Sequence, residues 1–292
     1  MAPQNDPARL RLALPKGRMQ AGVFSLLADA SISLSAGERS YRPVISLASF
    51  DVKILNPQNI VEMLDAGARD IGFAGADWVA ELQADLIEVL DTGLDPVRLV
   101  AAAPAESLVD GTLPAGAPLV VASEYERLTR AWIADRGLQA SFLKSYGATE
   151  VFPPEDADCI IDNTATGSTL RSNNLHIVDE LMASSTRLYV NPAVLEDRSR
   201  REQVDNLVML VKSVLESRRR VMLEINVSRE MLDDLVTILP CMREPTVSSL
   251  NGDSGFAVKA AVPRSQLTSL IPRIKGKGGT DIVVTSPAQI IP

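Results

Sequence analysis

Apolar segments that resemble strands alternate with amphipathic, helix-like segments along the first half of the chain, and this alternation limits the fold more than any other feature. Leu10–Leu14 has the period-two pattern of a strand, and a Pro-Lys-Gly-Arg turn leads from it into a helix expected over 19–29. Strands are also expected at 51–55 and 70–74, each followed by a helix, and the second helix is expected to begin at Trp78 after the loop Gly75-Ala76-Asp77. This order predicts an α/β layer with a largely parallel sheet.

A second block with the same character begins near Arg98. It contains an amphipathic helix expected over 124–136, which ends at Gly137, a residue typical of a helix C-terminus. The segment 188–217 has a long helical pattern, which we expect to begin near Pro192 and to link the block to the C-terminal part of the chain. The strands expected in this block lie at 99–103, 119–122, 141–144 and 159–162.

Residues 218–292 have a different order of elements. The pattern predicts a strand, a helix, two strands joined by an Asn-Gly-Asp turn, a second helix and a final strand. This βαββαβ order is the ferredoxin-like arrangement that is common in small ligand-sensing domains. The expected elements are at 221–227, 228–239, 246–250, 256–262, 263–275 and 281–285.

Composition excludes several classes of function. The net charge of −8 argues against a nucleic-acid surface, which needs a basic footprint, and a single histidine excludes a multi-histidine metal site. No apolar run reaches the roughly 18 residues that span a membrane, and the polar first residues do not resemble a secretory signal. Two distant cysteines in apolar surroundings, Cys159 and Cys241, are expected to be buried free thiols, which indicates a cytoplasmic protein.

The segment 158–170 carries the strongest chemical signal. An apolar strand ends at Asp162, a small hydroxyl-rich loop follows, and a helix is expected to begin at Ser168. Free N–H groups at a helix start bind phosphate, Gly167 allows close approach of the backbone, and a carboxylate can accept hydrogen bonds from ribose hydroxyls. The loop therefore predicts a site for a sugar phosphate, although the hydroxyls of such a loop also serve simply as helix caps.

At this point the sequence resembles the ATP phosphoribosyltransferase family, in the long form with a C-terminal histidine-binding regulatory domain. The matching segments occur in the family's order and cover nearly the whole chain. They are LPKGRM at 14–19, DIGFAGAD at 70–77, GATEV at 147–151, ADCIIDNTATGSTLRSNNL at 157–175, and Leu239-Pro240 with Glu244-Pro245-Thr246. The chain departs from the family pattern at 56–59, where charged residues are common, at Asn163, where an apolar residue is common, and at Asn174, where Gly is usual.

The resemblance implies a bilobed catalytic unit like a type II periplasmic binding protein, followed by the ferredoxin-like regulatory domain. The first catalytic domain would comprise 1–97, completed by 182–217, the second 98–181, and the regulatory domain 218–292. The implied reaction is the first step of histidine biosynthesis, in which adenine N1 of ATP displaces pyrophosphate, with Mg²⁺ bound, from phosphoribosyl pyrophosphate. Family members form dimers and hexamers and are inhibited by L-histidine. A non-catalytic sensor or regulatory subunit that binds a phosphorylated metabolite is the alternative.

Candidate site residues come from the matching positions. Lys16, Arg18 and Asp162 are the catalytic candidates, and Glu150 and Asp162 are the candidates for contact with Mg²⁺, which is held mainly by substrate phosphates. The residues expected to bind phosphoribosyl pyrophosphate are Glu150, Asp158, Asp162, Thr164, Ala165, Thr166, Gly167, Ser168 and Thr169. Those expected to bind ATP are Lys16, Gly17, Arg18, Gly75, Asp77 and Tyr125, and those expected to bind histidine are Glu224, Leu239, Pro245 and Thr246.

Several of these residues have a plainer interpretation that the sequence leaves open. Lys16 and Arg18 can be solvated turn charges, and Asp77 can cap the helix at Trp78 instead of binding nucleotide. Tyr125 can pack in the core instead of stacking on adenine. The histidine-site candidates can be surface residues of an edge strand.

Overall fold

The computed structural model of the chain describes residues 9–35, 41–114 and 116–291, which divide into two compact units. The first unit comprises Met1–Ser25 and Ile32–Asp205, and the second comprises Leu26–Ser31 and Asn206–Pro292. No helix among the described residues is both long and apolar enough to cross a lipid bilayer.

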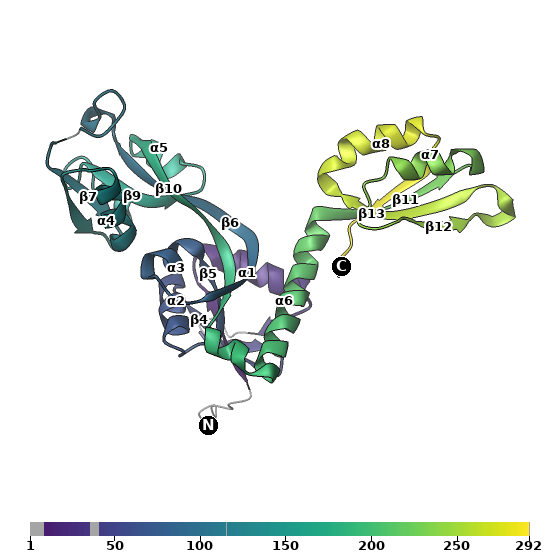
Figure 1. Cartoon of the computed structure of the whole chain (residues 1–292), viewed down its shortest axis with the longest axis horizontal. Helices are drawn as coiled ribbons and strands as arrows, with labels where there is room; N and C mark the ends of the chain where they lie inside the picture. The colour runs from purple at the N-terminus through teal and green to yellow at the C-terminus, as the bar shows by residue number, and fades with distance from the viewer. Residues whose placement is uncertain (1–8, 36–40, 115, 292) are drawn as a thin grey trace. The chain divides into compact units, whose positions relative to one another are not determined.

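The first unit is built on one eight-stranded mixed sheet in the order β4-β1-β5-β10-β6-β9-β7-β8 (Figure 1). Two sets of three parallel strands, β4-β1-β5 and β9-β7-β8, are joined through the long antiparallel pair β6 and β10. β10 pairs with β5 through its last residues, and β6 pairs with β9 through 98–102, so this pair is common to both sets. The strands are β1 (Leu10–Pro15), β4 (Phe50–Leu55), β5 (Ile71–Gly75), β6 (Ile87–Pro104), β7 (Leu119–Ser123), β8 (Ala140–Lys144), β9 (Cys159–Thr164) and β10 (Leu175–Val190), with a separate short pair β2 (Leu34–Ser35) and β3 (Val44–Ile45).

Helices follow the strands of the parallel sets, and their patterns explain their positions. α2 begins with Pro57 in its first turn after Asn56, and it buries Ile60, Val61 and Leu64 against the sheet. α4 buries Trp132 and ends before Gly137, which has a φ of 62°. The helices of this unit are α1 (Arg18–Asp29), which extends into the second unit, α2 (Pro57–Asp65), α3 (Ala76–Leu82), α4 (Glu126–Asp135), α5 (Ser168–Ser172) and the first part of α6 (Arg198–Arg219).

The long antiparallel pair is where the sequence-based expectation was wrong. No strand was predicted at 175–190, where β10 lies, and β6 was expected only from Leu99, while a helix was expected from about Pro192. The helix itself begins later, at Arg198, after a short 3-10 segment over Pro192–Glu196. A loop was also expected at 75–77, but α3 begins at Ala76, directly after β5.

The second unit contains a four-stranded antiparallel sheet in the order β12-β13-β11-β14 (Figure 1). One face carries the apolar core, in which alternate residues of β11 pack with residues of α7 and α8, including Leu235, Leu270 and Ile274. The predicted order of elements is present, although the helix expected at 228–239 is a 3-10 turn followed by a short α7. The elements are β11 (Arg220–Val227), α7 (Leu232–Thr237), β12 (Thr246–Ser249), β13 (Phe256–Pro263), α8 (Leu267–Gly276) and β14 (Thr280–Thr285).

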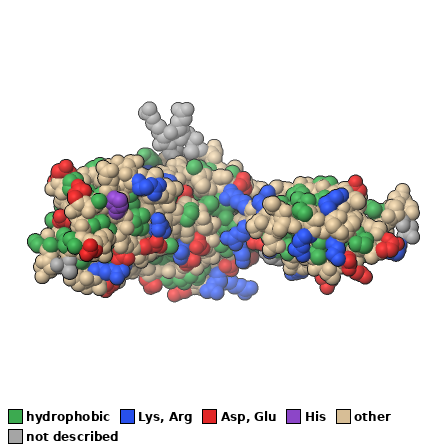
Figure 2. Space-filling view, turned by 90° about the horizontal axis from the view of Figure 1, so that it is seen from above, with side chains coloured by type: hydrophobic (Ala, Val, Ile, Leu, Met, Phe, Trp, Pro, Cys, Tyr) green, Lys and Arg blue, Asp and Glu red, His purple; other side chains and the backbone are tan. Residues whose placement is uncertain are grey.

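Three single residues depart from simple expectations. Both cysteines are free, but only Cys159 is buried, since Cys241 is partly exposed. The chain's one histidine, His176, is exposed on β10 (Figure 2, purple). Asn174 has a φ of 55°, a left-handed conformation that glycine and asparagine tolerate best, which explains why either residue suits this position.

Candidate functional site

Two pockets lie next to each other in the first unit and share two lining residues, Arg18 and Asn163. The first pocket has a volume of about 220 Å³ and the second about 290 Å³. The first is lined by Lys16, Arg18, Met19, Pro57, Gly75, Asp77, Trp78, Asp95, Val97, Tyr125, Asn163, Ser184, Ser185 and Thr186. The second is lined by Arg18, Glu150, Asp162, Asn163, Thr164, Ala165, Thr166, Ser168, Thr169 and Leu170.

The second pocket is formed by the end of β9 and the loop that leads into α5. Gly167 has a φ of 73°, so it adopts the left-handed turn without the cost that a side chain would add. The Thr164 hydroxyl accepts a hydrogen bond from the Gly167 N–H at 3.0 Å, and the hydroxyls of Thr166 and Ser168 lie 3.0 Å apart. These contacts order the loop, while Ser168 and Thr169 stay exposed at the start of α5. The loop therefore offers hydroxyl and N–H donors to an anion.

Asp162 is the central carboxylate of the second pocket. Its pKa is raised to about 6, chiefly by burial and also by the negative charges of Glu150 and Glu124, while the hydrogen bond from the Asn163 backbone N–H and the charge of Arg18 act in the opposite direction. The carboxylate thus lies where negative charge is poorly compensated, which favours the binding of a cation or of hydrogen-bond donors such as sugar hydroxyls. No cluster of three or more acidic, histidine or cysteine side chains in the described part of the chain is placed to hold a metal ion by itself.

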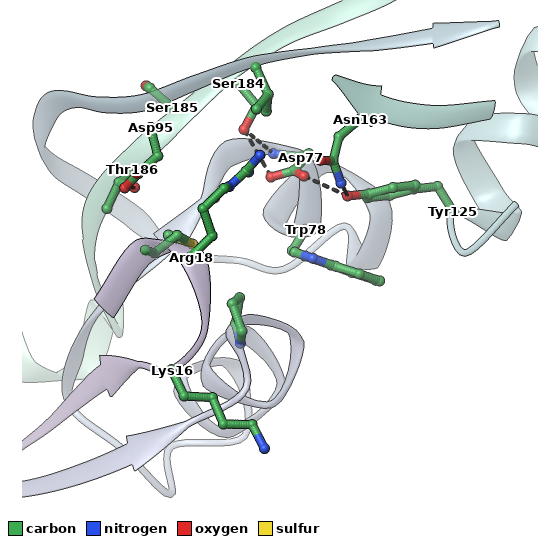
Figure 3. A pocket seen from close by; sticks show the side chains of 14 residues that line it. Lys16, Arg18, Asp77, Trp78, Asp95, Tyr125, Asn163, Ser184, Ser185 and Thr186 are labelled. Carbon is green, nitrogen blue, oxygen red and sulfur yellow. Dashed lines mark hydrogen bonds between the residues drawn. The ribbon is translucent and has the colours of Figure 1, made fainter. Parts of the chain in front are cut away.

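The first pocket receives its positive charge from the turn after β1. Lys16 and Arg18 flank Gly17, whose φ of 74° is again left-handed, and both cations line the pocket (Figure 3). Locally concentrated cations of this kind can attract a polyphosphate even on a chain whose net charge is −8. Lys16 and Arg18 therefore both line the pocket, and the Arg18 side chain is also exposed to solvent.

A buried hydrogen-bond network forms one wall of the first pocket. Tyr125 donates to Asp77 Oδ2 at 2.7 Å, Ser184 donates to Asp77 Oδ1 at 2.8 Å, and Asn163 Nδ2 donates to the Tyr125 hydroxyl at 2.9 Å (Figure 3). Tyr125 is fully buried, with its ring centroid 4.7 Å from that of Trp78. Asp77 therefore does not cap a helix at Trp78, because it lies in the first turn of α3. Its carboxylate accepts hydrogen bonds from Tyr125, which directly precedes α4, and from Ser184 on β10, while Asn163 on β9 joins the network through Tyr125.

Comparison with known proteins identifies the family. A family model described as ATP phosphoribosyltransferase matches residues 56–213, and one described as HisG, C-terminal domain, matches 217–287. An ATP phosphoribosyltransferase of Pelotomaculum thermopropionicum is 35% identical over 97% of this chain and 100% of that protein. The chain belongs to the ATP phosphoribosyltransferase family. A second relative of the same name, from Chlorobium phaeobacteroides, is 34% identical over 94% of each chain.

A solved structure of the ATP phosphoribosyltransferase family supports the fold. It is described as the ATP phosphoribosyl transferase (HisG:HisZ) complex from Thermotoga maritima. The matched chain is 28% identical to this one, with a TM-score of 0.63. The match covers 71% of this chain and 98% of that chain.

One predicted phosphate-site residue of this family member lies away from the second pocket. Asp158 precedes β9, and its carboxylate accepts a hydrogen bond from the Val120 N–H of β7 at 2.8 Å. Asp162 lies four residues further along the same strand, which corresponds to about 13 Å of extended chain. Asp158, which was expected to bind phosphoribosyl pyrophosphate, therefore lies at the opposite end of β9 from Asp162 and does not line the second pocket.

Sequence reasoning missed part of the first pocket in this family member. Ser184, Ser185 and Thr186 come from β10, and Asp95 comes from β6, the two long strands that were not fully recognised. Thr186 donates to Asp95 Oδ2 at 3.0 Å, so these groups lie beside each other across the two strands. The run of three hydroxyl residues was the signal that could have drawn attention to β10.

The structure only partly brings together the four residues predicted to bind histidine. Glu224 on β11 pairs in register with Lys259 on β13, which pairs in register with Thr246 on β12, so the three lie in a row on the sheet. All three are exposed, and Lys259 Nζ lies 2.8 Å from Glu224 Oε1. Leu239 instead packs in the core on the other face, and Pro245 directly precedes β12.

Proposed function

We propose that this chain is an ATP phosphoribosyltransferase that catalyses the first step of histidine biosynthesis, a glycosyl transfer from phosphoribosyl pyrophosphate to ATP. The observation that carries the proposal is the pair of adjoining pockets. The second pocket contains the Asp162 carboxylate and a hydroxyl-rich loop, which suit a ribose phosphate. The first pocket contains two cations, which suit a nucleoside triphosphate, and Arg18 and Asn163 line both pockets.

The reaction needs no protein nucleophile. The lone pair of adenine N1 attacks the anomeric carbon, the bond from that carbon to the pyrophosphate oxygen breaks, and pyrophosphate leaves with the electron pair. Asp162 and Glu150 hold the ribose hydroxyls or the metal, the loop 164–169 binds the 5-phosphate, and Lys16 and Arg18 offset the charge of the polyphosphates. Holding both substrates in line supplies the proximity effect, and the cations stabilise the charge that develops on the leaving group.

The residues of the second pocket fit Mg²⁺. The ion prefers oxygen ligands and usually binds proteins through one or two carboxylates together with substrate phosphates. Glu150 and Asp162 both line this pocket, and the raised pKa of Asp162 marks a place where added positive charge is favourable. Bound there, the ion would neutralise the leaving pyrophosphate.

The finer architecture belongs to the same proposal. The two sets of parallel strands would form the lobes of a catalytic unit like a type II periplasmic binding protein, with 1–97 and 182–217 in one lobe and 98–181 in the other. Residues 218–292 would form a ferredoxin-like regulatory domain, consistent with the strand order β12-β13-β11-β14. We expect a cytoplasmic homo-oligomer, dimer to hexamer, that is inhibited by L-histidine.

An ultraviolet assay of product formation with ATP, phosphoribosyl pyrophosphate and Mg²⁺ tests the activity. We expect turnover by the wild type and a loss of about 100-fold in both Asp162→Ala and Lys16→Ala, because each removes a charge that acts on the transition state. Asp205→Ala and Lys212→Ala, exposed charges on α6, are matched controls that keep full activity. Near-normal rates in both site variants would overturn the residue assignment, and binding of both substrates without product would favour the non-catalytic sensor.

A further inference from the structure

The hydrogen bonds around Tyr125 fix which way the amide of Asn163 points. An ionised carboxylate only accepts hydrogen bonds, so the single proton of the Tyr125 hydroxyl goes to Asp77. Burial, and then the negative charge of Asp77, raise the pKa of the Tyr125 hydroxyl, so the hydroxyl keeps that proton. The group 2.9 Å away on Asn163 must then be a donor, which is Nδ2.

The side-chain oxygen of Asn163 therefore points away from the Tyr125 hydroxyl. In Figure 3 the amide turns its nitrogen to the Tyr125 hydroxyl and its oxygen away from it. Among the described residues no hydrogen-bond donor is recorded for this oxygen, and the side chain lines both pockets. Asn163 therefore offers an acceptor of fixed orientation at the boundary between the two pockets.

The reaction determines what lies at that boundary. Adenine N1 must reach the anomeric carbon of a ribose held by Asp162, and Asn163 is the next residue in the chain. The 6-amino group is the neighbour of N1 on the purine ring, so the edge that faces the ribose carries both. An acceptor at this point suits the amino group and leaves the N1 lone pair free, whereas a donor would bind the lone pair that has to attack.

We propose that Asn163 is a specificity-determining residue that accepts a hydrogen bond from the 6-amino group of the adenine base, with Tyr125 and Asp77 as positioning residues that hold its amide in this orientation. The proposal rests on the proposed function, because it takes the first pocket as the base site. It adds selection of 6-aminopurine over 6-oxopurine nucleotides, whose O6 would face the Asn163 oxygen as acceptor to acceptor.

The same contact assists the chemical step. As N1 forms its bond to the anomeric carbon, positive charge develops on the N1–C6–N6 unit, and the amino group becomes a stronger donor. A hydrogen bond that strengthens in this way stabilises the transition state more than the bound substrate. Loss of the Asn163 oxygen is therefore expected to lower kcat as well as to weaken ATP binding.

Calorimetry on the full-length chain compares ATP with purine riboside 5′-triphosphate, which lacks only the 6-amino group. We expect the wild type to bind ATP about tenfold more tightly than the analogue, as one hydrogen bond of this kind allows. In Asn163→Leu the two nucleotides should bind equally. Asn206→Leu, the same change at an exposed position of α6, should keep the wild-type ratio.

Tyr125→Phe provides the second test, because it keeps the amide and removes its anchor. The preference for ATP over the analogue should fall to about threefold, and inosine triphosphate should bind better relative to ATP, because a freed amide can offer Nδ2 to O6. The inference would be overturned if the ratio of the affinities for ATP and the analogue were the same in the wild type and Asn163→Leu, or if Tyr125→Phe left this ratio unchanged. Either result would leave the proposed function intact. A wild type that neither binds ATP nor forms product would instead refute the proposed function.

Discussion

Among single residues, Asp162 is the one whose charge state should control substrate binding most directly. Its pKa is raised to about 6 by burial and by the charges of Glu150 and Glu124, so below that pH the carboxyl is neutral in most of the protein molecules. Only the ionised form attracts Mg²⁺ or accepts two hydroxyl hydrogen bonds. We predict that the affinity for phosphoribosyl pyrophosphate with Mg²⁺ rises as pH increases through 6, measured by calorimetry between pH 5 and 8. Asp162→Asn should flatten the profile, and an unchanged profile in this variant would contradict the assignment.

The stability of the ligand-free chain should respond to the same group with the opposite sign. A carboxyl whose folded pKa is raised contributes stability that is fully present below its unfolded pKa near 4 and is lost as pH rises through 6. Asp162→Asn removes the cost of a buried charge, so above pH 7 it should be more stable than the wild type by up to about 3 kcal/mol. The site thus trades folding stability for ligand affinity, a common property of binding sites.

The sequence predicted one part of the site and missed another, for reasons visible in single residues. The loop from Asp162 to Thr169 is continuous in the chain, so its chemistry could be read from neighbouring residues. Asp77 meets Tyr125 and Ser184 across 48 and 107 positions, and no local pattern reports such partners. Those contacts exist only because the sheet brings α3, α4 and β10 together.

Among the elements, β6 and β10 show why the expectation of a largely parallel sheet was incomplete. β6 has 18 residues, far more than a typical strand of five or six, and it contains Gly93, Asp95 and Pro96, residues that usually mark turns. Gly93 and Asp95 have φ values of 65° and 47°, and the pairing with β10 shifts register several times. These irregularities break the period-two pattern. The parallel strands could be predicted because they are short, apolar and regular.

A buried ion cluster ties the elements of one end of this sheet together. Asp70, just before β5, accepts hydrogen bonds from the backbone and guanidinium of Arg11 on β1, and its Oδ1 lies 2.6 Å from Arg200 on α6. Its side chain is only 3% exposed. Burial by itself would raise the pKa of Asp70, but the hydrogen bonds from Arg11 and Arg200 together lower it.

We predict that Asp70→Asn lowers the free energy of unfolding at pH 7 by about 2–3 kcal/mol, because it leaves two partly buried guanidinium groups without a counter-charge. Urea denaturation measures the change. Asp51→Asn is the matched control, because Asp51 is 40% exposed and lies 3.4 Å from Arg69, a pair whose loss should cost less than about 0.5 kcal/mol. Since the folded pKa of Asp70 is lowered, its contribution is present above pH 4 and is lost as pH falls below it. An equal effect of both variants at pH 7 would refute the role of the cluster.

At the scale of the whole molecule, charged side chains are arranged differently in the two units. The chain is acidic overall, yet both polyphosphate substrates are proposed to bind where Lys16 and Arg18 are concentrated. The second unit carries a different arrangement, an exposed ion pair of Glu224 and Lys259 beside the Thr246 hydroxyl. An amino acid offers an ammonium group and a carboxylate, which are complementary to the two charges of this pair.

We therefore predict that L-histidine binds on this exposed face of the sheet and that Glu224→Gln and Thr246→Ala weaken its binding by about tenfold and threefold, because one loses a charged partner and the other a neutral hydrogen bond. Calorimetry with histidine measures the affinity, and the product assay measures the inhibition. Asp234→Asn is a matched control, since Asp234 forms a comparable exposed ion pair with Lys277 at 2.8 Å on the helices that cover the opposite face. Unchanged affinity in both Glu224→Gln and Thr246→Ala would remove this face from the histidine site. Weakened affinity with unchanged turnover in the absence of histidine would show that the sheet senses the inhibitor without taking part in the reaction.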